Sequence, residues 1–104
     1  MSSPVSAVQG DGPSERVGPV LQSGAAADAV IAAIAELNPG VELVDRGAYV
    51  RVLVANRCVV TRAAIELRTK RPFHLPRDLE AIMSSFKGRF RVTADEASWE
   101  LVSR

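Results

Sequence analysis

Apolar and polar residues alternate most regularly between residues 45 and 62. Three valines recur at every second position, and larger or charged side chains fill the positions between them. The valines are Val50, Val52 and Val54, and the intervening residues are Tyr49, Arg51 and Leu53. This alternation predicts a strand with one buried face and one outward face. Because Asn56 interrupts the apolar run, we expect the chain to turn back at 55–57 and return through 58–60 as a β-hairpin.

Upstream of this hairpin, the apolar positions follow a helical spacing of three and four residues. They are Ala27, Val30, Ile31, Ile34 and Leu37. The pattern predicts a helix over 24–37, with Ser23 as its N-cap and Asn38-Pro39-Gly40 as its end. We expect a short strand before it at 17–22. A second strand follows at 41–45, with a turn near Arg46-Gly47 leading into the hairpin.

Two further helices are predicted after the hairpin. Thr61 is a suitable N-cap for a short helix that starts at Arg62 and ends before Pro72. A third helix begins near Pro76, because proline favours the first turn, and Gly88 is expected to end it. Its apolar stripe consists of Leu75, Leu79, Ile82, Met83 and Phe86.

The last segment predicts a second hairpin, with strands at 88–93 and 97–102 joined across 94–96. Its inward side chains are expected to be Phe90, Val92, Trp99 and Leu101. The predicted order is therefore β-α-β-β-β-α-α-β-β. This order predicts a single small α+β domain, mainly antiparallel sheet with about three helices. Residues 1–16, rich in Ser, Gly and Pro, are expected to form a flexible tail, which leaves 17–104 as the domain.

Composition narrows the class of partner. The chain has 104 residues, 47% of them hydrophobic, which suits one domain with a modest core. Its 13 basic and 12 acidic residues give a net charge of +1, so we expect neither nucleic acid nor a membrane surface as partner. One cysteine, no apolar run of about 18 residues and no signal-peptide pattern predict a cytoplasmic protein.

No familiar catalytic motif is present in the sequence. His74 is the only histidine and Cys58 the only cysteine, so a zinc site of the Cys/His type lacks ligands. A Cys-His dyad has this one possible pairing. We interpret Cys58 as a small core residue and His74 as a loop or helix-cap residue. We therefore expect no catalytic residue, no metal site and no bound cofactor, with a small enzyme using Cys58 or His74 as an alternative.

Basic residues gather around the predicted second helix. They are Arg62, Arg68, Lys70, Arg71 and Arg77. The simplest interpretation is that these residues form an ordinary solvent-exposed face. The more specific hypothesis is that they form a surface on which another protein docks. Nucleic acid is the weaker alternative, because too few aromatic residues accompany the charges to form a stacking platform.

Several short motifs, in this order along the chain, resemble one known family. They are Val17-Gly18-Pro19, Asn38-Pro39-Gly40, Asp45-Arg46-Gly47-Ala48-Tyr49-Val50-Arg51, Thr61-Arg62, Arg71-Pro72-Phe73 and Ser85-Phe86-Lys87-Gly88. Together they resemble the MmoB/DmpM family, the small effector or coupling proteins of bacterial multicomponent di-iron monooxygenases. The similarity covers roughly residues 17–101 and is greatest to the toluene and alkene monooxygenase branch.

The resemblance implies a regulatory protein with no cofactor or active site of its own. Members of the family bind a di-iron hydroxylase and modulate oxygen activation, substrate access and coupling. A ferredoxin and a reductase deliver the electrons and can compete for the same hydroxylase surface, so indirect competition or cooperation with them is expected. The resemblance thus implies a non-catalytic monooxygenase component, expected to be a monomer when free. The alternative is a small α+β ligand-binding or protein-interaction module unrelated to oxygenases.

If the resemblance holds, the contacts to the hydroxylase are expected on the outward face of the hairpin and around the second helix. The candidate partner-binding residues are Arg46, Tyr49, Arg51, Arg62, Arg71 and Phe73. Tyr and Arg are enriched among residues that dominate interface energies. For Arg46 and Arg51, salt bridges on the sheet surface remain an equally weighted alternative.

Overall fold

The strands form two antiparallel sheets. The computed structural model describes residues 15–102. The strands are β1 (Arg16–Gln22), β2 (Glu42–Asp45), β3 (Tyr49–Ala55), β4 (Arg57–Thr61), β5 (Met83–Lys87), β6 (Arg89–Val92) and β7 (Glu96–Glu100). Sheet 1 has the order β2-β3-β1-β5, and sheet 2 has the order β4-β7-β6. Of the expected tail, residues 1–14 lie outside the described residues, whereas Arg16 is part of β1 and pairs with Ala55.

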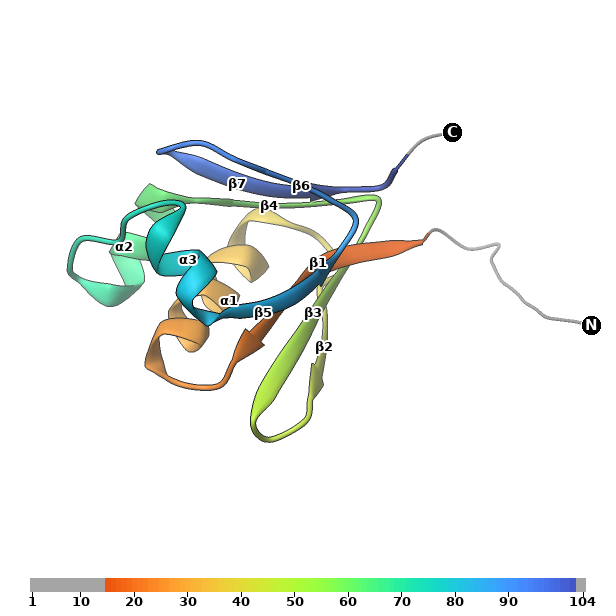
Figure 1. Ribbon diagram of the computed structural model, residues 1–104, viewed down its shortest axis with the longest axis horizontal. Helices are drawn as coiled ribbons and strands as arrows, with labels where there is room; N and C mark the ends of the chain where they lie inside the picture. The colour runs from red at the N-terminus through yellow and green to blue at the C-terminus, as the bar shows by residue number, and fades with distance from the viewer. Residues whose placement is uncertain (1–14, 103–104) are drawn as a thin grey trace, which may run out of the picture.

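Three helices gather on one side of the molecule, and the described chain begins and ends on the opposite side (Figure 1). They are α1 (Ala25–Leu37), α2 (Arg62–Thr69) and α3 (Arg77–Ile82). The α+β class with antiparallel sheet and three helices is therefore confirmed. The elements follow the predicted order, with one additional strand, β5.

The predicted hairpin between β3 and β4 is wrong, although both strands exist. β3 pairs with β1 along one edge and with β2 along the other, so neither edge is left for β4. β4 instead pairs with β7. Asn56, with φ of 68°, redirects the chain between the sheets. The backbone N–H of Asn56 donates to the Glu15 carbonyl at 3.0 Å, and its backbone carbonyl accepts from the Leu101 N–H at 2.9 Å. Asn56 therefore connects the two sheets.

The third helix is shorter than predicted. It ends at Ile82, and the next residues form β5 along the free edge of β1. Of the expected apolar stripe, Leu79 is fully buried, but Phe86 is 46% exposed because it lies on an edge strand. In residues 83–87, backbone hydrogen bonds to β1 take the place of the hydrogen bonds that a longer helix would make. Gly88 therefore does not cap a helix and instead joins β5 to β6, at φ of 104°.

Helix α1 matches its predicted bounds to within one residue, but its N-cap was assigned wrongly. Gly24 occupies the cap position without a side-chain bond, and the Ser23 hydroxyl donates to the Gly47 carbonyl at 2.6 Å. Ser23 thereby ties the start of α1 to the β2–β3 turn. At the other end Asn38 is extended, as Pro39 requires.

The second helix and the last hairpin are confirmed. The Thr61 hydroxyl accepts from the Ala64 N–H at 3.1 Å and caps α2. β6 and β7 pair across the predicted turn, and Trp99 is fully buried. Leu101 is an exception, since it lies beyond β7 and is 37% exposed.

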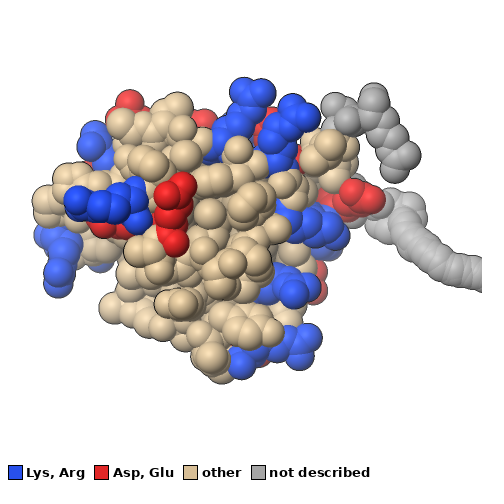
Figure 2. All heavy atoms as spheres, viewed as in Figure 1, with Lys and Arg blue, Asp and Glu red and all other residues tan. Residues whose placement is uncertain are grey.

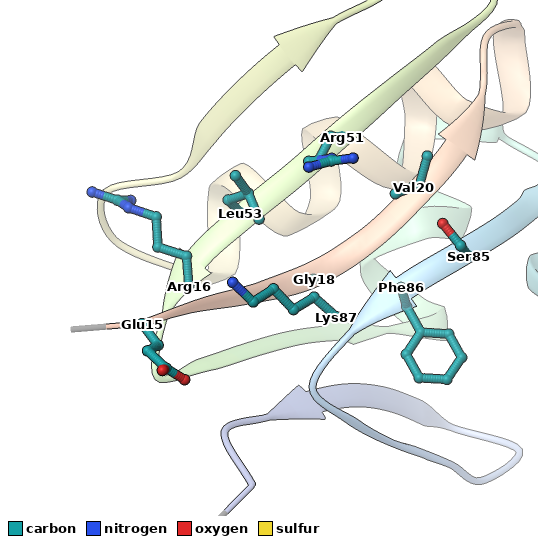
Figure 3. A pocket seen from close by; sticks show the side chains of 9 residues that line it. All are labelled: Glu15, Arg16, Gly18, Val20, Arg51, Leu53, Ser85, Phe86 and Lys87. Atoms are coloured by element: carbon teal, nitrogen blue, oxygen red, sulfur yellow. The ribbon is translucent and has the colours of Figure 1, made fainter. Parts of the chain in front are cut away.

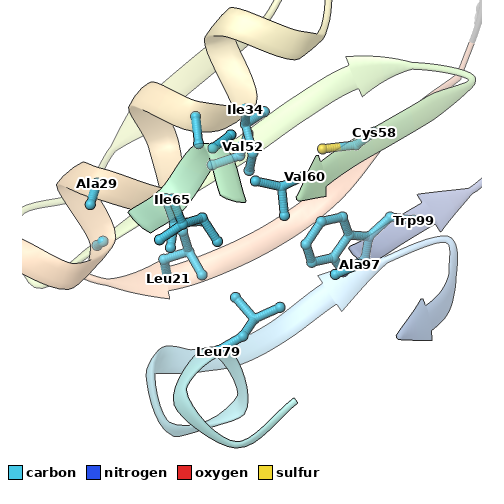
Figure 4. Close-up of a cluster of buried hydrophobic side chains, with 14 of the residues drawn as sticks. Leu21, Ala29, Ile34, Val52, Cys58, Val60, Ile65, Leu79, Ala97 and Trp99 are labelled. Atoms are coloured by element: carbon cyan, nitrogen blue, oxygen red, sulfur yellow. The ribbon is translucent and has the colours of Figure 1, made fainter. Parts of the chain in front are cut away.

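The core fills the space between the two sheets and the helices (Figure 4). Its largest fully buried side chains come from seven different elements. They include Leu21, Ile34, Val52, Val60, Ile65, Leu79 and Trp99. One continuous core thus joins both sheets, and the outer faces of the sheets remain available for contacts.

Candidate partner-binding surface

The outward face of β3 presents the first group of candidate residues. Val52 and Val54 are buried, as the alternation predicts, so the residues between them face away from the core. Tyr49 is 39% exposed at the start of the strand, and Arg51 is exposed two positions later. Arg51 lies directly opposite Val20 of β1 and Val44 of β2 in the registers of the sheet. An arginine thus stands over apolar neighbours at the centre of sheet 1.

Arg46 lies in the tight turn that connects β2 to β3. Its N–H donates to the Tyr49 carbonyl at 2.9 Å, and its own carbonyl accepts from the Ala48 N–H at 3.0 Å. The Gly47 N–H donates to an Asp45 carboxylate oxygen at 2.8 Å. These bonds hold the turn in one shape, so Arg46 and Tyr49 are presented on a fixed part of the backbone.

The second group of candidates surrounds α2. The Arg62 guanidinium lies 3.3 Å from an Asp95 carboxylate oxygen. In addition, the backbone N–H of Arg62 donates to the backbone carbonyl of Asp95 at 2.8 Å. Arg71 is exposed in the loop after α2, beside a groove of about 630 Å³ against α1. The Thr69 hydroxyl donates to the Arg71 carbonyl at 2.8 Å, which fixes this loop.

Phe73 is only 6% exposed and belongs to the core, so its ring presents little surface to a partner. Its N–H donates to a Glu66 carboxylate oxygen at 2.9 Å. The buried ring and this bond anchor the loop to α2. Phe73 is thus fixed within the loop that carries Arg71.

The structure divides the candidate residues into two separate groups. Tyr49 and Arg51 lie on β3 and Arg46 in the turn before it, whereas α2 packs against α1 and β4. In the view of Figure 2, charged residues of both signs are spread around the rim, and the centre consists mainly of uncharged residues. This face therefore carries no broad basic patch.

Two further cations of sheet 1 are not among the candidate residues predicted from the sequence. The sequence pattern places Lys87 in a helix and Arg16 in the tail, whereas Lys87 lies on β5 and Arg16 on β1, and both line one hollow together with Arg51. Ser84 and Ser85, which favour helix interiors poorly, were the available signal that the helix ends early.

Cys58 is fully buried on β4, directly opposite Trp99 of β7. Burial raises the pKa of its thiol from 9.0 to about 12, although the nearby Arg57 charge lowers it slightly. The interpretation of Cys58 as a core residue is confirmed. Because the thiolate is the nucleophilic form, the thiol is inert at neutral pH.

We expect a disulfide reagent such as DTNB to leave Cys58 of the folded protein unmodified at pH 8. The rise in pKa reduces the thiolate fraction about 1000-fold, and burial also blocks access. The absorbance of released thionitrobenzoate measures the reaction, with the urea-unfolded chain as control. Equal rates for folded and unfolded protein would contradict the burial of this thiol.

His74 occupies the loop before α3, as predicted. The backbone N–H of His74 donates to an Asp78 carboxylate oxygen at 2.8 Å. This bond lowers the pKa of the Asp78 carboxyl group, and Arg77 contributes to the shift. Within residues 15–102, no group of three or more His, Cys, Asp or Glu side chains is placed to hold a metal ion. In the same part of the chain, no helix is long and apolar enough to cross a membrane.

Comparisons with known proteins identify relatives over most of the chain. The model of the MmoB/DmpM family matches residues 15–100. The effector subunit of the alkene monooxygenase system of Xanthobacter autotrophicus strain Py2 is 47% identical over 85 residues, which are 80% of this chain and 83% of that protein. A solved phenol hydroxylase–regulatory protein complex contains a chain of similar fold, with TM-score 0.74 and 21% identity, covering 84% of this chain and 98% of that one.

Proposed function

This chain belongs to the MmoB/DmpM family, and we propose that it is the effector subunit of a multicomponent di-iron monooxygenase. The observation that carries the proposal is the extent of the match. Residues 15–100 include every strand and helix of the structure, from β1 to β7. The whole domain, and not one motif within it, therefore resembles the effector proteins.

In this proposal the chain contributes a surface and no reactive group. Cys58 is buried with a raised pKa, and the backbone of His74 is bonded to Asp78. The hydroxylase supplies the di-iron centre, and this chain needs no cofactor of its own. A ferredoxin and a reductase deliver the electrons, and this chain competes or cooperates with them indirectly at the hydroxylase. We further propose that the free effector is a cytoplasmic monomer.

The physical basis of such regulation is differential binding. An effector changes the hydroxylase only if it binds one conformation more tightly than another. A preference of about 3 kcal/mol shifts a conformational equilibrium roughly 150-fold. Such a shift is sufficient to control oxygen activation, substrate access and coupling.

We assign the docking contacts to Arg46, Tyr49 and Arg51 on sheet 1, and to Arg62 and Arg71 beside α2. The first group has the geometry of an interface anchor, because Tyr49 combines a half-exposed ring with a fixed backbone. Arg62 is engaged with Asp95, so its contribution to docking is expected to be smaller.

Adding this chain to the purified hydroxylase, ferredoxin and reductase of its system is expected to raise the product formed per NADH oxidised. The reason is that the effector binds the productive conformation of the hydroxylase more tightly and so increases its population. Product and NADH are measured in parallel as the effector is titrated. An unchanged yield would favour the alternative, a protein-interaction module unrelated to oxygenases, and product made by this chain alone would contradict a non-catalytic role.

The matched variant for this titration is Tyr49→Ala. We expect half-maximal stimulation to require about tenfold more of the variant, because an anchoring tyrosine contributes at least about 1.4 kcal/mol to an interface. Val102→Ala is the control, since Val102 is 57% exposed beyond β7 and lies away from both groups of candidates. Equal behaviour of the two variants would remove Tyr49 from the interface.

A further inference from the structure

The outer face of sheet 1 contains a hollow of about 470 Å³ across β1, β3 and β5 (Figure 3). Its floor is formed by backbone and small or apolar side chains of the two central strands. Gly18 and Val20 come from β1, and Leu53 comes from β3. Gly18 lies opposite Lys87 of β5 in the register of the sheet.

Three cations surround this apolar floor, each from a different strand. They are Arg16 of β1, Arg51 of β3 and Lys87 of β5. Figure 3 shows the Lys87 side chain extending across β1 toward Leu53, with Arg51 on the far side of the floor. Among residues 15–102, Glu15 is the one carboxylate that lines the hollow. The charge of the hollow is therefore positive, although the chain as a whole is nearly neutral.

The cations of this hollow differ in their partners. Arg16 lies 3.4 Å from a carboxylate oxygen of Glu42. Among the described residues, no carboxylate lies within 4.0 Å of the charged groups of Arg51 or Lys87. The hollow therefore presents two cations that have no counterion within this part of the chain.

Sheet 2 offers a comparison, because one of its exposed arginines is paired within the chain. Arg57 of β4 lies 3.0 Å from Glu100 and 3.5 Å from Glu96, both on the neighbouring β7. Arg89 and Arg91 of β6 are exposed and, among the described residues, have no carboxylate within 4.0 Å. What distinguishes Arg51 of sheet 1 is therefore the apolar floor over which it stands.

We propose that this hollow docks an acidic segment of the hydroxylase. The segment places one apolar side chain against Val20 and Leu53, and its carboxylates bind Arg51 and Lys87. Arginine suits this role because its guanidinium can bind a carboxylate through two parallel hydrogen bonds. The inference rests on the proposed function, and it adds the chemistry of the partner surface and the contribution of Lys87.

The test is a double charge reversal, Arg51→Glu with Lys87→Glu, measured by calorimetric titration against the intact hydroxylase. We expect the Kd to rise about 100-fold, because two attractive contacts become repulsive. The wild-type affinity should weaken between 50 and 300 mM salt, and the variant should lose most of this dependence. Circular dichroism and thermal unfolding verify that the variant is folded.

The matched control is Arg89→Glu with Arg91→Glu, which changes the net charge equally on two exposed positions of β6 in sheet 2. We expect its Kd to stay within threefold of the wild type. If both double variants bind equally weakly, the effect is one of overall charge and the hollow is not the docking site. If the sheet 1 variant binds and stimulates normally, the inference fails and the proposed function stands. If the wild type does not bind the hydroxylase, both fail.

Discussion

Replacing Gly18 by alanine is expected to destabilise the protein by about 4 kcal/mol, the largest effect that we predict for one substitution. A Cβ atom at this position would overlap the carbonyl oxygen of Val52 on β3 and lie 3.0 Å from its carbonyl carbon. Both are backbone atoms, so no side chain can rotate away. Gly18 also has φ of 148°, which L-residues rarely adopt. Overpacking and backbone strain each cost about 1–3 kcal/mol.

The position of β1 makes this cost difficult to avoid. β1 lies between β3 and β5, and its five central residues are buried. Moving it away from Val52 would disturb the pairing on both sides and the core beneath. A domain of this size has a total stability of only about 5–15 kcal/mol, so this substitution is expected to remove between about a quarter and most of it.

Urea unfolding measures the effect, and Gly24→Ala is the matched control. Gly24 has φ of 151°, nearly the same as Gly18, but a Cβ atom there would meet nothing within 4 Å. We expect this variant to lose only about 1 kcal/mol, from strain alone. Similar losses for both variants would show that overlap with β3 is not the cause.

The second large effect is expected for Asn38→Ala, at about 3 kcal/mol. Asn38 is 8% exposed, and its side chain acts as a short backbone segment between α1 and β4. Its amide nitrogen donates to the Ile34 carbonyl at 2.8 Å and to the Val59 carbonyl at 2.7 Å. Its oxygen accepts from the Val59 N–H at 3.0 Å. Alanine would leave the Val59 N–H and carbonyl without this partner, at about 1–3 kcal/mol for each that stays buried, whereas the Ile34 carbonyl keeps the backbone N–H of residue 38.

Thermal and urea unfolding again provide the measurement. The control is Ser23→Ala, which removes one exposed hydrogen bond between a side chain and a backbone carbonyl. We expect that loss to stay below about 1 kcal/mol, because water replaces the hydroxyl. If Asn38→Ala costs no more than Ser23→Ala, the bonds between α1 and β4 contribute little to stability.

The separate elements could be predicted from the sequence wherever a local period decided them. The valines of β3 and the apolar stripe of α1 each repeat with the period of the structure that they form. Thr61 caps α2 through a bond to a residue three positions away. These features depend on neighbours along the chain, and the order of residues is therefore sufficient to specify them.

The candidate site was predicted only in part. Tyr49 and Arg51 face outward because β3 alternates, and alternation can be read from the sequence. Lys87 required knowledge that residues 83–87 pair with β1, and the burial of Phe73 required the loop to be anchored at Glu66. Both depend on contacts between segments that are distant in sequence.

By itself, the sequence determined the class of the domain, most element boundaries and the outward positions of β3. Only the tertiary structure decided that β3 and β4 belong to different sheets, and that residues 83–87 form a strand. The physical reason is that strand pairing is a competition for edges. β1 and β2 occupy both edges of β3, and the free edge of β1 offers hydrogen bonds to a segment that would otherwise extend a helix. The same pairing brings Arg16, Arg51 and Lys87 around one hollow.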